Sequence, residues 1–468
     1  MRIAFLFCLI PTLVTGCLFT PKHTCESIRT EFASELCNLD KEAPDDPPAC
    51  SLAEPVSLTE AIAIALENNP ETNIAVARIR KAEAMVAEAE AAFWPRLGMY
   101  TSYTRGNAPS AALFKTIDQR RLEPGTDFNR PGNFDNYETG INADINIFNG
   151  GRDRLNMEIS RIGLEISQLD RQVVENDLTA AVIKSYFDIM AARDYITIAE
   201  KSVDTVSEQL RVMRIRYESG SVLKSDFLSL KVRFAQAEEE LVRSLNQLAV
   251  TKGIFAVILG IDPLMEINLK QEPCRPAEVP PDYTDAVSLA IEKRPELAKL
   301  RNQLIQARIA LDLAWSDYLP TLDAGARYYF DDTDLKYDED RNNWTIAVML
   351  NWELFSGFSA SAAKKKFHAA IVELLHANRK ILQAIKLDVK TAYLRRDESE
   401  LRMKSAKSAS VMAAESFNLV RQQFDGGSAT ITRYLEAELA WNRAGLNETT
   451  AYYDWAKAQA DIKRSIGL

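Results

Sequence analysis

Apolar and polar positions alternate strictly in two segments of the chain, residues 137–147 and residues 344–354. A period of two predicts strands that have one apolar and one polar face. Each segment has about the length that a tilted strand needs to cross a bilayer. The apolar series is Tyr137, Thr139, Ile141, Ala143, Ile145 and Ile147 in the first strand, and Trp344, Ile346, Val348, Leu350, Trp352 and Leu354 in the second.

The opposite faces of these strands are polar, with Glu138, Asn142, Asp144, Asn146, Asn351 and Glu353 among their residues. A weaker alternation from Leu97 to Thr104 predicts a partner strand, separated from the first clear strand by a loop over roughly 105–134. Periodicity alone also fits an amphipathic hairpin that covers a soluble core.

Helical spacing replaces the alternation after Gly151. Ile159, Ile162, Ile166, Leu169 and Val173 succeed one another at steps of three and four, which is a heptad seam. The pattern predicts one helix from Arg152 to about Glu218, which would be on the order of 100 Å long if straight. The turns after the long helices contain Gly220 in the first half of the chain and Gly426 and Gly427 in the second, and glycine permits a tight reversal into a returning helix.

The whole order of elements occurs twice. The segment from Ser57 to Leu97 reappears from Asp282 to Leu322, and Gly260 matches Gly467. Ser57 and Glu60 form a capping-box pattern, and the helix that they open is expected to run to about Phe93. A copy of this length is too long for a solenoid repeat. We therefore predict a mainly α fold with a small β part, built from repeat one (57–262), a Pro-rich linker (263–282) and repeat two (283–468), each repeat being helix, β-hairpin, long helix and helix.

The N-terminus has the features of a secretory signal peptide over residues 1–16, with Arg2 ahead of an apolar stretch. The small residues before Cys17 resemble a bacterial lipoprotein cleavage site, which would leave Cys17 lipidated at the start of an N-terminal extension (17–56). Ordinary cleavage nearby, with Cys17 incidental, is the alternative. Leu18 after the cysteine favours the outer membrane for such lipoproteins.

Cysteine usage agrees with export. Of the six cysteines, Cys8 would leave with the signal peptide and Cys17 would be acylated. The remaining four are candidates for disulfides in an oxidising compartment, where three pairings are possible. Our preference is Cys50 with Cys274 and Cys25 with Cys37.

Composition narrows the functional classes. The net charge is −10 with both signs interspersed, so we expect no nucleic-acid partner. The three histidines have no metal-ligand spacing, and no nucleophile elbow or P-loop occurs, so neither an enzyme nor a cofactor is expected. The charge runs Glu238–Glu240 and Lys364–Lys366 are expected to be solvated helix faces. No run of 18 apolar residues occurs after the N-terminus, so only strands are expected to enter a membrane.

Two hairpins give four strands, and four strands cannot close a barrel. An open sheet edge in hydrocarbon leaves backbone groups unsatisfied, at several kcal/mol each. If these strands enter lipid, several copies of the chain must share one barrel. The polar strand faces would then line a water-filled pore.

The chain resembles the TolC-like outer membrane efflux proteins over about residues 57–468. The resemblance depends on the duplicated order, the opening from Ser57 to Glu71, an aromatic-x-Pro-x-Leu start to the first strand of each repeat, a Phe-x-Gly end to the second, and the Gly-Ser turn between the long helices. It implies a homotrimer with a twelve-stranded barrel in the outer membrane lipid of a Gram-negative bacterium and a long periplasmic α-helical barrel.

The resemblance also implies a passive exit duct for tripartite efflux or type I secretion, with a periplasmic adaptor protein and an inner-membrane transporter as partners. The alternative is a periplasmic coiled-coil scaffold or adaptor whose hairpins form a soluble cap. One position departs from the family, in which acidic residues after the glycine turn line the periplasmic constriction. Repeat one has Asp226 there, whereas repeat two has Arg433, with Glu436 one helical turn further on.

In a trimer, Asp226 and Arg433 would alternate around one ring. Ion pairs between them would hold the tunnel shut, although each exposed pair contributes about 1 kcal/mol or less. The alternative is that both are solvated charges near a loop.

Overall fold

The computed structural model describes residues 55–127, 129–273, 278–334, 336 and 338–467. The predictions for the signal peptide, Cys17, Cys25, Cys37, Cys50 and Cys274 lie outside the described residues. The chain divides into two compact units, of which the first contains, among the described residues, 55, 56 and 266–270. Within it, Val56 bridges Leu269 in a parallel sense, and the Val56 amide donates to the Asn268 carbonyl oxygen at 2.8 Å. The second unit, residues 57–265 and 271–468, contains the long helices and the sheet.

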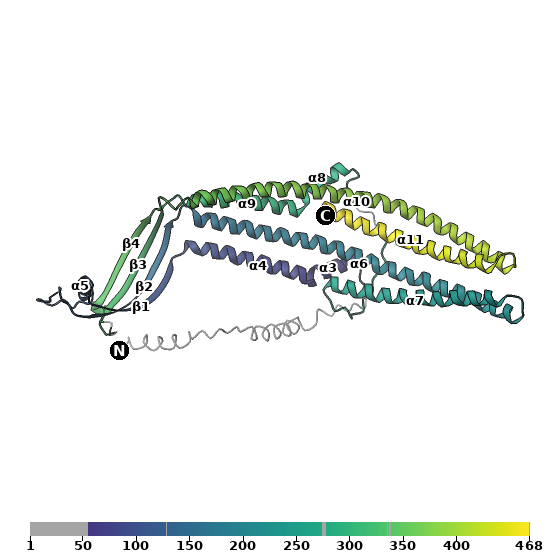
Figure 1. Ribbon diagram of the computed structural model, residues 1–468, viewed down its shortest axis with the longest axis horizontal. Coiled ribbons are helices and arrows are strands. Elements are labelled where there is room, and N and C mark those ends of the chain that lie inside the picture. The colour runs from purple at the N-terminus through teal and green to yellow at the C-terminus, as the bar shows by residue number, and fades with distance from the viewer. Residues whose placement is uncertain (1–54, 128, 274–277, 335, 337, 468) are drawn as a thin grey trace. The chain divides into compact units, whose positions relative to one another are not determined.

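Two series of elements succeed one another in the same order (Figure 1). The long helices α6 and α10 contain 67 residues each, and the returning helices α7 and α11 contain 36 each. The first series is α3 (Leu58–Asn68), α4 (Pro70–Glu90), η1 (Ala91–Phe93), β1 (Arg96–Gly106), α5 (Pro109–Asp118), β2 (Phe134–Phe148), α6 (Arg152–Glu218) and α7 (Lys224–Leu259). The second is α8 (Tyr283–Lys293), α9 (Pro295–Ser316), β3 (Thr321–Asp332), η2 (Glu339–Arg341), β4 (Asn342–Asn351), α10 (Ser359–Asp425) and α11 (Ile431–Ile466).

The prediction of a single helix from Ser57 to Phe93 is wrong, because the helix is interrupted at Asn69 and a second helix begins at Pro70. Asn69 ends α3 and also caps α4, since its side-chain oxygen accepts from the Glu71 amide at 2.8 Å. Proline has no amide hydrogen and fits the first position of a helix rather than its interior. The capping box at Ser57 and Glu60 is confirmed, with both reciprocal hydrogen bonds present.

The four strands form one antiparallel sheet in the order β1-β2-β3-β4. The register aligns Met99 with Ile141, Ile141 with Tyr328, and Tyr328 with Trp344, so these side chains share one face. β4 ends at Asn351, before the predicted end at Leu354. The sheet lies at one end of the long helices, and the α6–α7 and α10–α11 turns lie at the other end (Figure 1).

A cluster of apolar and aromatic side chains joins α6, α7, α10 and α11 near these turns. The Phe417 ring stacks on Trp441 at 5.0 Å between centroids and contacts Tyr434 at 5.6 Å. Burial raises the pKa of the Tyr434 hydroxyl to about 12. The buried members of the cluster are Val206, Met213, Leu230, Phe417, Phe424, Ile431 and Tyr434.

One helix of the described chain, α7, is long and apolar enough to span a bilayer by length and composition, although no such helix was expected. α7 lies along α6 (Figure 1). It includes the charge run Glu238–Glu240, whose side chains are exposed. We therefore interpret α7 as a helix of the bundle.

The glycine that ends α7 is expected to tolerate no side chain. Gly260 and Gly220 both have φ of 75°, but a Cβ on Gly260 would lie 2.5 Å from the Asn68 carbonyl oxygen, whereas nothing lies within 4 Å of one on Gly220. We expect Gly220→Ala to lower the free energy of unfolding by about 1 kcal/mol, through φ strain alone. Gly260→Ala adds a backbone clash and should cost at least twice as much, measured by denaturant unfolding of the purified protein. Equal losses would show that the Gly260 contact is irrelevant.

Candidate functional site

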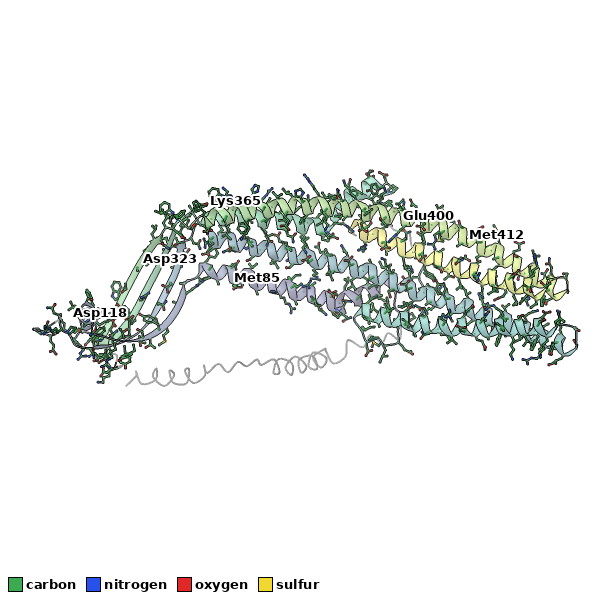
Figure 2. The ribbon with its side chains drawn as sticks, viewed as in Figure 1. Met85, Asp118, Asp323, Lys365, Glu400 and Met412 are labelled. Atoms are coloured by element: carbon green, nitrogen blue, oxygen red, sulfur yellow. The ribbon has the colours of Figure 1, made fainter. Side chains whose placement is uncertain are left out.

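The polar face of the sheet forms a hollow of about 890 Å³. Charged groups of both signs meet there, including Arg96 opposite Asp144 in the β1–β2 register. The Asn146 amide donates to the Asp323 carboxylate at 2.7 Å, and Figure 2 labels Asp323 at the end of the sheet that adjoins the helices. The polar series predicted for β2 therefore lines a concave, polar surface.

The opposite face of the sheet is apolar and exposed. Exposed apolar surface on this scale marks a contact with lipid or with another protein. Within the described chain, nothing covers this face. The side chains with more than half of their area exposed are Leu97, Met99, Tyr103, Ile141, Ile147, Trp344, Ile346, Val348 and Leu350.

A short helix, α5, lies at the end of the sheet that is distant from the long helices, where the sequence analysis predicted a loop (Figure 1). α5 begins with Pro109 at its first turn, and its Lys115 ammonium lies 2.7 Å from Glu138 and 2.8 Å from the fully buried Asp331. Burial disfavours the ammonium charge, but hydrogen bonds to Asp331 and Glu138 outweigh burial and raise the pKa of Lys115. The ion pairs of Lys115 therefore hold α5 against the polar face of the sheet, at the end where Figure 2 labels Asp118.

The glycine turns lie at the far end of the long helices. Gly220 and Gly427 have φ of 75° and 77°, in the left-handed region that favours glycine. Gly426 has φ of −80° and caps α10, with its amide bonded to the Gln422 carbonyl oxygen at 3.0 Å. Only one glycine of the Gly426–Gly427 pair is thus required by backbone geometry.

The predicted constriction residues come directly after these turns. Asp226 lies in the first turn of α7 and is half buried, whereas Arg433 and Glu436 lie at the start of α11 and are exposed. The Arg433 amide donates to the Thr430 side chain at 3.3 Å, which caps α11. Within the part of the chain that the structure describes, the Asp226 and Arg433 side chains form no ion pair with each other.

A buried ion pair that the sequence analysis missed lies close to the turns. Arg233 on α7 donates to Glu438 on α11 at 2.8 and 2.9 Å, and the two side chains are 3 % and 0 % exposed. The Ser202 hydroxyl on α6 donates to Glu438 at 2.9 Å, and Asn442 donates to Ser202 at 2.7 Å. Burial disfavours the guanidinium charge, but hydrogen bonds to Glu438 outweigh burial and raise the pKa of Arg233.

The spacing of α11 contained a signal for this pair. Ile431, Tyr434 and Glu438 succeed one another at helical steps, and the first two are buried. A carboxylate at the next position of an apolar seam must be paired to be buried. The network connects α6, α7 and α11, so it joins elements of both series.

No group of three or more possible metal ligands occurs among the residues that the structure describes. A sheet with one apolar and one polar face, continued by long paired helices, is the geometry expected of strands that contact lipid on one face and water on the other.

Comparison with known proteins gives the family. The profile of the outer membrane efflux protein family matches residues 61–253 and 286–468. The chain belongs to this family. Members of the outer membrane efflux protein family are channels, so the prediction of an outer membrane duct is confirmed and the scaffold alternative is not favoured.

Individual relatives agree with this assignment. The alkaline protease secretion protein AprF of Pseudomonas aeruginosa is 24 % identical over 88 % of this chain and 85 % of its own length. The pyoverdine export outer membrane protein OpmQ of the same species is 23 % identical over 80 % of this chain and 77 % of its own. The crystal structure of the Campylobacter jejuni CmeC outer membrane channel, at 16 % identity, superposes with a TM-score of 0.74 over 88 % of this chain and 85 % of that one.

Proposed function

We propose that three copies of this outer membrane efflux protein assemble into one passive exit duct. Each copy would contribute its four strands to a twelve-stranded barrel and its long helices to a tunnel through the periplasm. In this proposal the chain consists of two tandem repeats, 57–262 and 283–468, joined by the linker 263–282.

The observation that carries the proposal is the four-stranded sheet with its two unlike faces. β1 and β4 are the edges of this sheet, and in hydrocarbon their free backbone groups require partner strands. The exposed apolar side chains, such as Val348, require lipid, and the charged hollow on the other face requires water. A closed ring of several copies meets all three requirements.

Two measurements on the detergent-solubilised protein test the duct. Light scattering should give a trimer mass, and the same sample should open conducting pores in planar bilayers. A monomer that stays in solution without detergent would overturn the proposal.

Anchoring and cross-linking are further parts of the proposal. A lipid on Cys17 would attach each subunit to the outer membrane, and intact-mass analysis of the mature protein should show acylation there. Cys25, Cys37, Cys50 and Cys274 would form two disulfides in the periplasm. Peptide mapping without reduction would identify the pairs.

The helical tips would face the partners. AprF is by name a protease secretion protein and OpmQ a pyoverdine export protein. By analogy we propose that the tips of this chain dock to a periplasmic adaptor and, through it, to an inner-membrane transporter. Crosslinks from the α6–α7 and α10–α11 turns to an adaptor would test this.

We further propose that Asp226 and Arg433 of neighbouring subunits form a ring of ion pairs that narrows the tunnel, with Glu436 behind it. Both residues stand just after a glycine turn, and Arg433 is exposed and Asp226 half buried, so a neighbouring copy could reach them. An exposed pair contributes about 1 kcal/mol or less, so removal of one partner should raise conductance by up to roughly fivefold.

The measurement is the single-channel conductance of Asp226→Ala and Arg433→Ala in planar bilayers, each compared with wild type. The charge-exchanged double variant Asp226→Arg/Arg433→Asp should return to the low conductance. If both single variants conduct like wild type, these side chains are only solvated charges beside a turn.

A further inference from the structure

The start of α10 carries three consecutive lysines, Lys364–Lys366, next to the end of the sheet, and Figure 2 labels Lys365 there. Lys365 and Lys366 are exposed and Lys364 is half buried. None of the three ammonium groups forms an ion pair with a residue that the structure describes. Nearby Arg152, in contrast, is paired with Asp317. The lysines therefore present unneutralised positive charge.

These lysines stand where the apolar face of the sheet ends. The Lys364 ammonium lies 3.9 Å above the Trp315 ring, and Trp315 contacts the Tyr318 ring at 5.6 Å. The indole of Trp352 donates to the Tyr318 carbonyl oxygen at 3.1 Å. Since Trp352 is the second residue after Leu350, this chain of contacts continues the apolar face of β4. Aromatic rings and lysines of this kind occupy the headgroup level of a membrane.

Phe358 gives an independent indication. It has φ of 66°, a conformation that L side chains rarely adopt, and its ring is 75 % exposed against Phe355. The corresponding residue of the first series, Gly151, has φ of 80° without any such strain. The contact with Phe355 leaves most of the strained ring exposed, and strain of this kind marks functional positions.

The charge also distinguishes the two series. The positions that correspond to Lys364–Lys366 in α6 are Met157, Glu158 and Ile159. The helices match in length, so the fold does not require lysine there.

We propose that Lys364–Lys366, Trp315 and Phe358 bind the phosphate headgroup of an anionic phospholipid in the leaflet that faces the periplasm. One ammonium group of the run pairs with the phosphate while its neighbours, which point to other sides of the helix, add to the local positive charge, and the two rings lie against the glycerol and upper acyl region. This inference rests on the proposed insertion of the sheet into the outer membrane.

The test is a titration of the detergent-solubilised full-length protein with phosphatidylglycerol, monitored by native mass spectrometry. The triple variant Lys364→Gln/Lys365→Gln/Lys366→Gln should bind the lipid about fivefold more weakly for each charge removed, and its binding should lose most of its salt dependence. The triple arginine variant at the same positions keeps the charge and should bind as wild type does. Lys407→Gln, further along α10, should also have no effect.

Three outcomes would overturn the site: unchanged binding by the glutamine variant, equal binding of phosphatidylcholine, or competition by free glycerol phosphate at the same concentration as lipid. Planar-bilayer conductance of the same samples separates the two proposals. If the glutamine variant conducts normally and binds phosphatidylglycerol like wild type, only the proposed lipid site is overturned. If the wild-type protein neither oligomerises nor conducts, the proposed duct is overturned.

Discussion

Glu438→Gln is expected to destabilise the helical tips by about 3 kcal/mol, because it removes the buried carboxylate that forms the shortest ion pair with the Arg233 guanidinium. Arg233 is 3 % exposed, and the one other ion pair that it keeps in the described chain is with the half-exposed Glu240, at 3.7 Å. Hydrogen exchange should report the loss as faster exchange of amides in α7 and α11 near the turns.

A matched surface pair provides the control. Glu400 and Lys404 on α10 lie 2.7 Å apart, against 2.8 Å for the buried pair, but their side chains are 45 % and 64 % exposed (Figure 2 labels Glu400). We expect Glu400→Gln to change stability by about 0.5 kcal/mol or less. The apolar double variant Arg233→Met/Glu438→Leu should recover most of the stability that Glu438→Gln loses, because neither charge then remains buried. A Glu438→Gln loss as small as that of Glu400→Gln would mean that water reaches the pair.

Val348→Arg is expected to prevent insertion of the sheet into the outer membrane. Val348 is 64 % exposed on the apolar face, near the middle of β4. An arginine facing lipid at the bilayer midplane costs about 2–4 kcal/mol, and three copies would raise this to roughly 6–12 kcal/mol per trimer. The measurement is the fraction of protein that becomes a heat-modifiable oligomer in outer membrane extracts.

The neighbouring residue is the control for Val348→Arg. Ala347 lies on the other face of the same strand and lines the polar hollow. Ala347→Arg adds the same charge and volume where water can solvate it, so assembly should remain close to that of wild type. If both variants assemble equally well, the apolar face does not contact lipid.

The sequence predicts the long elements well because their physical signals are long. A heptad seam without proline sets α6, and strict alternation sets the faces of β2 and β4. The helix break at Pro70 was missed because the apolar spacing continues across it, although a proline inside a helical pattern is itself a boundary signal. α5 was missed because it is short and has no side-chain N-cap, so that its stability depends on the ion pairs of Lys115.

Residues of the candidate site were predicted unevenly for a related reason. The polar series of β2 is evident from periodicity alone. Glu438 was overlooked because carboxylates are mostly exposed, and its partner Arg233 lies on a helix distant in sequence. Pairing between residues that are distant in the sequence is only weakly evident from the local sequence pattern.

The equal lengths of α6 and α10 limit how such a chain can change in evolution. Since both helices have 67 residues, both hairpin tips of a subunit reach the same depth below the sheet. An insertion of one heptad in a single copy would lift one tip by about 10 Å relative to the other and break the level rim that a partner would meet. A change in the length of α6 must therefore be matched by an equal change in α10, so the lengths of the two long helices are expected to change together.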